Sequence, residues 1–501
     1  METQIFFPTS CCDFIYHRTD GQRYRNSFKD KRLSNQYNCL MRSMMNNQSA
    51  VVHQLSQTRK GTTGFYRFLN NPQVGLSEII VKSCQIEPEM VHSKDILVLM
   101  DGTSIGLRSK LRSGDQWRKT MGVIDDNRTP GFYINCALVI DNQRHSVLGL
   151  GDIVVYSRPK IDADNKANYH VRVARKKLPL HAKESYVWAL NGINCHKNMP
   201  LAQRITCIID QGGDKYESLQ YLHQQTGRDF IVRSKENRMS TQLSTGDKGR
   251  LSSHLESVGW SDCHIIPIRA LNHYSKTNGI VQRSARKALL RMRYTTVLIH
   301  PPSSYTGADI TFSSIPLNVV EVLEDPRSVP YGEAPIHWRL LTTWDITNTA
   351  QAWQVVQAYQ SRWYIEQLFR VFKKQGMNVE YSQLKTPDAI KKQAVMALKT
   401  ASDAVRLVLA REGTEFIPIE TMFNEKEQKA LSKINQSLKG STIKQSNPHA
   451  ENSLAWAAWV IARLGGWKGY QSQRPPGPIT MKRGLEKYQN FIWAWEIVDG
   501  T

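Results

Sequence analysis

The sequence has no apolar run of about 18 residues, the length that a membrane-spanning helix needs. Its 8 cysteines include no C-x-x-C pair, which argues against a zinc ribbon and for a reducing compartment without a disulfide framework. The segment from Met1 to Phe28 lacks the basic-then-apolar plan of a secretory signal. These absences argue against a membrane protein and against a secreted protein held together by disulfides.

Acidic residues are scarce relative to basic ones. Lys and Arg number 66 against 44 Asp and Glu, so the formal net charge is +22. Such an excess favours a polyanionic partner, either nucleic acid or an anionic membrane surface. Because the positive charge is spread along the whole chain, we expect nucleic acid as the partner and no membrane.

The chain turns basic and helical from Asp30 onward. Leu33, Leu40 and Met44 fit one stripe of a helix, and further short basic helices are predicted before residue 80. A small DNA-binding domain is one interpretation of these helices. The other is an ordinary helical cap with a solvated basic face.

Two apolar runs typical of buried strands end in an aspartate. Residues 95–101 end at Asp101 and residues 205–210 end at Asp210, and glycines follow both. Further strands are predicted at 132–140, 147–156 and 229–233, with helices at 183–190 and 214–225. Strands that alternate with helices predict an α/β core with a mixed sheet.

The later parts of the chain differ from this core. Residues from about 240 to 344 predict a β-rich basic insertion, with strands at 294–300, 317–323 and 336–342. Helices are predicted at 388–412, 425–438 and 453–464, with a last helix after the Pro475 segment. We therefore expect three domains: a helical domain at 1–75, for which DNA binding is one interpretation, an α/β core at 76–385 interrupted by the insertion, and a helical domain at 386–501.

The run from Gln351 to Lys374 has no glycine or proline and is predicted to form one long helix. Steps of three, four and seven residues separate Tyr359, Arg362, Glu366 and Lys373, which would place them on one face. Such a face could hold an anion and its metal. The alternative is an ordinary Arg–Glu pair on a solvated face.

Asp101, Asp210 and Glu366 would converge where open α/β sheets build their sites, provided that this helix packs on the sheet. A set of carboxylates without His or Cys suits Mg²⁺ or Mn²⁺. Two such ions can clamp the attacking and leaving oxygens of a phosphoryl transfer. The pattern predicts a two-metal site, with Arg362 and Lys373 pairing with flanking phosphates.

The spacing Tyr-(2)-Arg-(3)-Glu-(6)-Lys at Tyr359–Lys373 resembles the motif of the DDE transposases of insertion-sequence family four, and within it the transposon-five type. Asp30 to Arg32 and residues 64–72 also fit, as do the Asp101-Gly-Thr-Ser and Asp210-x-x-Gly-Asp214-x-Tyr-Glu217 motifs. Residues 183–188, 230–235 and 461–466 match as well, so the resemblance runs from about Lys29 to the C-terminus. Several ordered motifs are more specific than a single pattern.

The resemblance implies a ribonuclease H-like mixed-sheet core with a β-rich insertion, flanked by helical N-terminal and C-terminal domains. It implies that Asp101, Asp210 and Glu366 bind two Mg²⁺ ions, for which Mn²⁺ can substitute. The implied activity is cut-and-paste transposition. The enzyme would bind the inverted repeats at the transposon ends, cleave them through a DNA hairpin, and join the 3′-hydroxyl ends to target DNA.

The resemblance also implies which residues contact DNA. A base flipped out of the hairpin would stack on Trp338, whose alternative role is that of a core aromatic. The family further implies a helical DNA-binding domain at 1–75, a catalytic core at 76–385 and a helical dimerisation domain at 386–501. It also implies a homodimer in a synaptic complex, in the bacterial cytoplasm and associated with the nucleoid. The implied DNA-binding residues are Tyr359, Arg362, Lys373, Trp338, Arg233 and Arg67.

Two alternative functions remain open at this point. Gln211-Gly212 stands where the family has Arg-Glu, and the first 28 residues depart from the family pattern. These departures favour an inactive, transposase-like DNA-binding protein that acts as an inhibitor. A structure-specific nuclease without strand transfer is the third hypothesis.

Overall fold

A computed structural model describes the protein over most of its length. The described residues are 13–15, 28, 30–56, 58–113, 115–158, 178–226, 229–268, 270–275, 279–303, 312–373, 376–411, 413, 416–438, 440, 446–470, 473 and 475–499. Most of the first 28 residues, for which a departure from the family pattern was noted, lie outside this set. None of the helices in these ranges is long and apolar enough to cross a bilayer.

The chain divides into two compact units. Unit 1 contains Met1–Asn168, Asn194–Gln203 and Trp363–Thr501. Unit 2 contains Tyr169–Ile193 and Arg204–Arg362. The predicted division into three domains is not tested by this partition and stays a prediction.

Unit 1 contains an antiparallel sheet in the order β1-β4-β3-β2. Its strands are β1 (Asp13–Ile15), β2 (Asp95–Gly106), β3 (Gly131–Asp141) and β4 (Val147–Ser157). Every residue of β3 and β4 is buried, so their near-continuous apolar runs reflect a sheet covered on both faces. The strands predicted at 132–140 and 147–156 are confirmed.

The predicted end of the first strand at Asp101 is wrong. The fully buried run stops at Met100, but β2 continues to Gly106. The reason is that β3 is long enough to pair with the extension, from Gly102 opposite Asn135 to Gly106 opposite Gly131. Asp101 therefore lies within a hydrogen-bonded strand.

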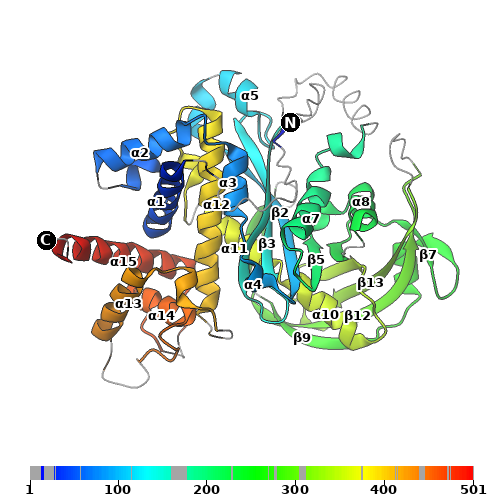
Figure 1. Ribbon diagram of the computed structural model, residues 1–501. Helices are drawn as coiled ribbons and strands as arrows, with labels where there is room; N and C mark the ends of the chain where they lie inside the picture. Colours follow the sequence, from blue (N-terminus) through cyan, green and yellow to red (C-terminus); the bar gives the residue numbers. More distant parts are fainter. Residues whose placement is uncertain are drawn as a thin grey trace. The chain divides into compact units, whose positions relative to one another are not determined.

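The helices of unit 1 pack around α12 (Pro387–Ala410), the long yellow-orange helix in Figure 1. It contacts β4, the N-terminal helices and the C-terminal ones. The other helices are α1 (Lys31–Asn47), α2 (Arg59–Asn70), α3 (Leu76–Ser83), α4 (Pro88–Val91), α5 (Asp115–Met121), α11 (Trp363–Phe372), α13 (Glu425–Leu438), α14 (Leu454–Leu464) and α15 (Pro478–Asp499). The helices predicted in these regions are confirmed, with ends shifted by a few residues.

A fully buried lysine on α12 fixes the end of α2. The Lys392 ammonium donates to the carbonyl oxygens of Asn71, at 3.2 Å, and Leu69, at 3.5 Å, and pairs with Asp388. Carbonyls at a helix C-terminus have no partner within the helix and carry partial negative charge, so a cation there is stabilising. These bonds from Lys392 hold the end of α2 against α12. The Asn-Asn-Pro sequence that ends the motif at residues 64–72 therefore has a structural role.

Unit 2 contains a mixed sheet. Its strands are β5 (Arg204–Ile209), β6 (Asp229–Arg233), β7 (Met239–Gln242), β8 (Lys248–Arg250), β9 (Asp262–Ile268), β12 (Arg286–Ile299), β13 (Ile315–Glu324) and β14 (His337–Thr342). β5 and β6 pair in parallel, and β6, β14, β13 and β12 follow in antiparallel order. β7 and β9 both pair with β12, and β10 (Leu271–Ser275) and β11 (Gly279–Arg283) form a separate hairpin.

Few helices accompany these strands. They are α8 (Tyr216–Thr226), α9 (Leu251–Glu256) and α10 (Thr349–Gln360), together with α7 (Tyr186–Asn198), whose last residues belong to unit 1. α10 packs on β13 and β14. The α/β class, the mixed sheet and the β-rich segment between about 240 and 344 are confirmed.

Within this β-rich segment, buried carboxylates pair with arginines. Glu324 accepts two hydrogen bonds from Arg286, both at 2.8 Å. Glu321 is 2% exposed and accepts hydrogen bonds from three basic side chains on β12 and β14. Burial opposes ionisation of Glu321, but hydrogen bonds from His337, Arg339 and Arg293 outweigh it and lower its pKa to about 2.

We expect this pKa shift to make unfolding depend on pH. The Glu321 pKa falls from 4.5 to about 2 on folding, so its contribution is fully present above pH 4.5 and is lost as the pH falls toward 2. A shift of this size corresponds to about 3 kcal/mol of unfolding free energy. Urea unfolding of wild type and Glu321→Gln from pH 7 to pH 3 should show a stability difference that narrows with falling pH. A difference that stays constant would contradict the prediction.

The prediction of one helix from Gln351 to Lys374 is wrong. α10 ends at Gln360 and α11 begins at Trp363. At the break the amides of Ser361 and Arg362 bond to carbonyls three residues back, and the Ser361 hydroxyl donates to Gln357 O, so the regular i to i−4 ladder stops without glycine or proline. Tyr359 and Arg362 belong to unit 2, whereas Glu366 and Lys373 belong to unit 1, so these four residues do not share one helix face.

Candidate active site

Asp210 lies directly after β5, as predicted. It begins a turn of 3-10 helix over Gln211–Gly213, and the Gly213 amide donates to its carbonyl at 2.9 Å. A side chain at position 213 would not fit, since its Cβ would lie 2.3 Å from Ile209 and 2.7 Å from Trp188. The close approach of Trp188 therefore requires glycine in the Asp210-x-x-Gly motif and fixes the turn that presents the half-buried Asp210.

Tyr359, near the end of α10, and Arg362, in the break after it, contact this carboxylate. The Tyr359 hydroxyl donates to Asp210 Oδ1 at 3.2 Å, and an Arg362 guanidinium nitrogen lies 3.7 Å from Oδ2. Burial of Tyr359, with the charge of Asp210, raises the pKa of this phenol well above its usual value, so it stays protonated and donates. The structure thus brings together three residues that sequence analysis had assigned to the site.

Two further predicted residues lie beside Tyr359. The ring of Trp338, on β14, meets the Tyr359 ring edge-on, with centroids 5.6 Å apart. Arg233, at the end of β6, donates to the His337 carbonyl at 3.2 Å. Its positive charge also lowers the Tyr359 pKa, though less than burial raises it. Unit 2 therefore gathers an acid, two arginines and two aromatics in one place.

Unit 1 holds the other two predicted carboxylates. The Gly102 amide donates to Asp101 Oδ1 at 2.8 Å, which orients this side chain on β2. Glu366 is exposed on α11, whose apolar side chains Ile365, Leu368 and Phe372 are buried. α11 packs directly on β2. The two elements that carry Asp101 and Glu366 therefore contact each other within unit 1.

Lys373 follows the last turn of α11, and its amide bonds to the Phe369 carbonyl at 3.0 Å. Among the described residues no group of three or more His, Cys, Asp or Glu side chains forms a ready metal site. The joint site of Asp101, Asp210 and Glu366 therefore stays a prediction, as do the roles given to its individual residues.

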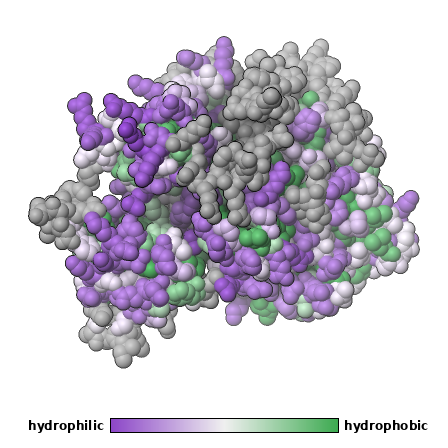
Figure 2. Space-filling model, viewed as in Figure 1, coloured by the Kyte–Doolittle hydropathy of each residue, from purple (hydrophilic) through white to green (hydrophobic). Residues whose placement is uncertain are grey.

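Arg67 lies far from these carboxylates in sequence, on the exposed side of α2. It lines a groove of about 860 Å³ between α1 and α2, together with Arg59 and Lys60 from the start of α2. The surface over α1 and α2 is largely hydrophilic in Figure 2. Three exposed cations along one groove are suited to phosphates.

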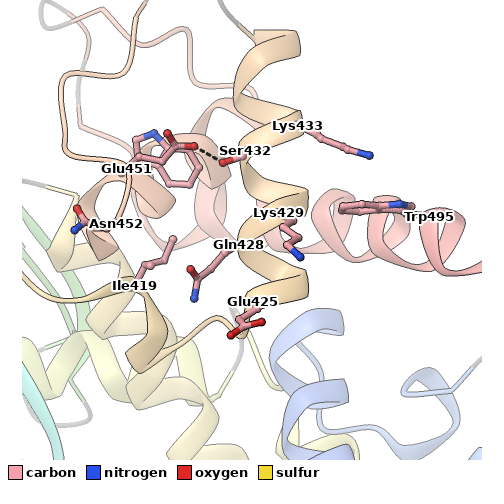
Figure 3. Close-up of a pocket in the computed structure, with 10 residues that line it drawn as sticks. Ile419, Glu425, Gln428, Lys429, Ser432, Lys433, Glu451, Asn452 and Trp495 are labelled. Atoms are coloured by element: carbon pink, nitrogen blue, oxygen red, sulfur yellow. Dashed lines mark hydrogen bonds between the residues drawn. The ribbon is translucent and has the colours of Figure 1, made fainter. Parts of the chain in front are cut away.

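A second groove, of about 750 Å³, lies among the C-terminal helices (Figure 3). Lys429 and Lys433 on α13 face it, and the Lys433 ammonium lies 4.2 Å from the centre of the Trp495 ring on α15. Ser432 donates to Glu451 at its edge. None of the predicted catalytic or DNA-binding residues lines it.

Sequence analysis missed the roles of two acidic residues near Asp210. Asp214 is 1% exposed and accepts hydrogen bonds from the amides of Lys235, at 2.7 Å, and Glu236, at 3.1 Å. It also pairs with Arg238. Glu217 binds Lys183 at 2.8 Å, which joins two of the matching motifs. Both positions belonged to quoted motifs, but their partners lie too far along the chain for spacing to reveal them.

The family model described as "Transposase DDE domain" matches residues 194–401. The matched segment runs from α7 into α12 and includes Asp210, Tyr359, Arg362, Glu366 and Lys373. Asp101 and Arg67 precede it. The chain therefore carries a transposase DDE domain over these residues.

Proposed function

We propose that this protein is a Mg²⁺-dependent cut-and-paste DNA transposase similar to the transposon-five type within insertion-sequence family four. The observation that carries the proposal is the placement of Asp210 after β5, bound by Tyr359 and Arg362, inside the segment that matches the DDE domain. The packing of α11 on β2 supports the participation of Asp101 and Glu366.

The donor set fits a hard divalent cation. Asp101 and Glu366 offer carboxylate oxygens on packed elements, and Asp210 offers a third, so the proposed ligand atoms are all oxygens. Asp101, Asp210 and Glu366 would hold Mg²⁺, or Mn²⁺ in its place. When bound, two such ions activate an oxygen nucleophile and stabilise the leaving oxyanion.

The cationic side chains would bind the phosphates of the DNA. In the free protein Arg362 neutralises Asp210, and an incoming phosphate offers the same guanidinium a second anionic partner. Lys373 and Arg233 would contact neighbouring phosphates, and Tyr359, which stays protonated, can donate but not act as a base at neutral pH. These contacts position the scissile phosphate and carry no sequence information.

The groove of Arg59, Lys60 and Arg67 supports recognition of transposon-end DNA by the N-terminal helices. With a net charge of +22, binding should weaken steeply with salt, because each neutralised phosphate releases counterions. A homodimer that pairs two ends through the C-terminal helices completes the proposal.

Replacement of Trp338 by alanine tests the hairpin step. The indole presents a large π-face beside Tyr359, and stacking of a flipped base there would offset about 1–3 kcal/mol of the unpairing cost. We expect Trp338→Ala to nick end DNA at the wild-type rate and to slow the hairpin step by about 10–100-fold. Denaturing gels of time courses separate these species, and a defect in first-strand nicking would assign Trp338 a structural role instead.

One observation favours the second function, an inactive DNA-binding inhibitor. Gln211 donates weakly to the Ser234 carbonyl at 3.5 Å, so no cation stands at the position where the family has arginine. Purified full-length protein should therefore be tested with DNA bearing the inverted repeats that flank its gene, a target plasmid and Mg²⁺. Double-strand breaks and joined products support the transposase. Binding without cleavage in Mg²⁺ or Mn²⁺ supports the inhibitor, and cleavage without joining supports a nuclease.

A further inference from the structure

Glu321 is a buried carboxylate in the middle of β13 that collects three basic side chains. It accepts hydrogen bonds from Arg293 Nε at 2.7 Å, Arg339 Nε at 2.9 Å and His337 Nε2 at 2.8 Å. The low pKa of Glu321 keeps it ionised at any physiological pH, so it can only accept, and the His337 Nε2 must carry a proton. Such charge-assisted bonds fix geometry more strongly than neutral ones.

The strand register places the bonds to Glu321 on both neighbours of Trp338, which are His337 and Arg339. Glu321 lies opposite Arg339, and Val322 lies opposite Trp338. Successive side chains of a strand point to opposite faces, so His337 and Arg339 turn toward Glu321 while Trp338 turns away. Both residues that flank Trp338 are therefore tied to one carboxylate.

On the face of the sheet opposite to Glu321, Trp338 contacts a residue of the candidate active site. Its ring packs against Tyr359 with centroids 5.6 Å apart, and the Tyr359 hydroxyl donates to Asp210 at 3.2 Å. Arg233 adds a bond to the His337 carbonyl. A continuous set of contacts within unit 2 thus joins Glu321 to Asp210.

We propose that Glu321 is a positioning residue for the reaction: by holding His337 and Arg339 it fixes the β14 segment that presents Trp338 to Tyr359. The proposal deepens the proposed function and rests on it for the reaction that is affected. Without this anion, Arg293 and Arg339 repel each other and the segment loses both anchors, so the indole gains mobility.

Asp325, the residue directly after β13, provides a matched control. It is also buried and pairs with arginines, Arg327 at 2.9 Å and Arg291 at 3.6 Å, but these lie outside the segment that carries Trp338. A general loss of buried ion pairs would affect Asp325→Asn and Glu321→Gln alike. A positioning role predicts an effect of Glu321→Gln alone.

The first measurement needs no DNA cleavage. Full-length protein labelled with 5-fluorotryptophan gives one fluorine resonance for each indole, and Trp338→Phe identifies that of Trp338. We expect this resonance to broaden or split in Glu321→Gln and to stay unchanged in Asp325→Asn. An unchanged Trp338 resonance in Glu321→Gln would overturn the proposal.

The second measurement follows the reaction. Glu321→Gln should nick end DNA within about threefold of wild type and lose about tenfold in the same later step as Trp338→Ala. An equal loss in all steps would overturn the positioning role while leaving the proposed function intact. Absence of cleavage by wild type would overturn the proposed function, and the fluorine spectrum would still decide the role of Glu321.

A further variant guards against misfolding. His337 is partly exposed, with 42% of its side chain accessible, so His337→Leu removes one bond to Glu321 without unfolding the protein. Should Glu321→Gln fail to fold, the Trp338 line width in His337→Leu decides. Broadening supports the proposal, and a wild-type line width contradicts it.

Discussion

Replacement of Glu366 by alanine, or of Asp210 by asparagine, is expected to abolish DNA cleavage while DNA binding persists. Each change removes a charged oxygen ligand from the proposed metal site. Loss of several kcal/mol of charge stabilisation in the transition state corresponds to a rate reduction of at least about 10³-fold. Cleavage is measured under single-turnover conditions, with enzyme in excess over end DNA in Mg²⁺.

The affinity for DNA, in contrast, should stay unchanged or increase slightly. A carboxylate beside Arg362 repels phosphate, so Asp210→Asn should bind end DNA as tightly as wild type or slightly more tightly in mobility-shift assays. Glu420→Ala, at an exposed glutamate elsewhere in unit 1, is the matched control and should cleave normally. Cleavage by Glu366→Ala at the wild-type rate would remove Glu366 from the site.

The largest effect on stability is expected from Asp214→Ala. The side chain is 1% exposed and satisfies two backbone amides and the guanidinium of Arg238, whose own side chain is 9% exposed. Removal of one partner of a buried ion pair leaves an uncompensated charge, at a cost of about 3–5 kcal/mol. Urea unfolding at pH 7 should show this loss as a lower midpoint.

The change also has a local consequence. The segment that Asp214 holds follows directly after Arg233 and β6, so DNA cleavage should fall even at temperatures where the variant remains folded. Asp247→Ala, at an exposed aspartate of the same unit, should stay within about 0.5 kcal/mol of wild type. Equal stability of the two variants would show that the Asp214 contacts contribute little.

Much of the scaffold was predictable because it depends on local pattern. The strands β3, β4, β5 and β6 are short apolar runs bounded by turn residues, and each was found within two residues of its expected ends. The position of Asp210 after β5 follows from the same signal. Helices such as α13, predicted at its observed bounds, are set by periodicity and by the lack of breakers.

The interpretation of the Tyr359–Lys373 motif was only partly correct. Tyr359 and Arg362 contact Asp210, but the single helix that was to present all four residues breaks at Ser361. Helix propensity alone does not predict such a break, because tertiary packing draws α10 onto β13 and β14 and α11 onto β2. The division between the two units falls at the same point, after Arg362.

The sequence by itself determined the α/β class, the buried strands and the basic character, and it supplied the residues that are predicted to form the site. These depend on composition and on neighbours a few positions away. Only the tertiary structure decided that Tyr359 and Arg362 bind Asp210, that Lys392 fixes α2, and that Glu321 ties the two neighbours of Trp338. The members of such pairs lie far apart in the sequence: Asp210 and Tyr359 are 149 residues apart, and Asn71 and Lys392 are 321 residues apart. Their contacts arise from the packing of whole elements, for which a single sequence contains no periodic signal.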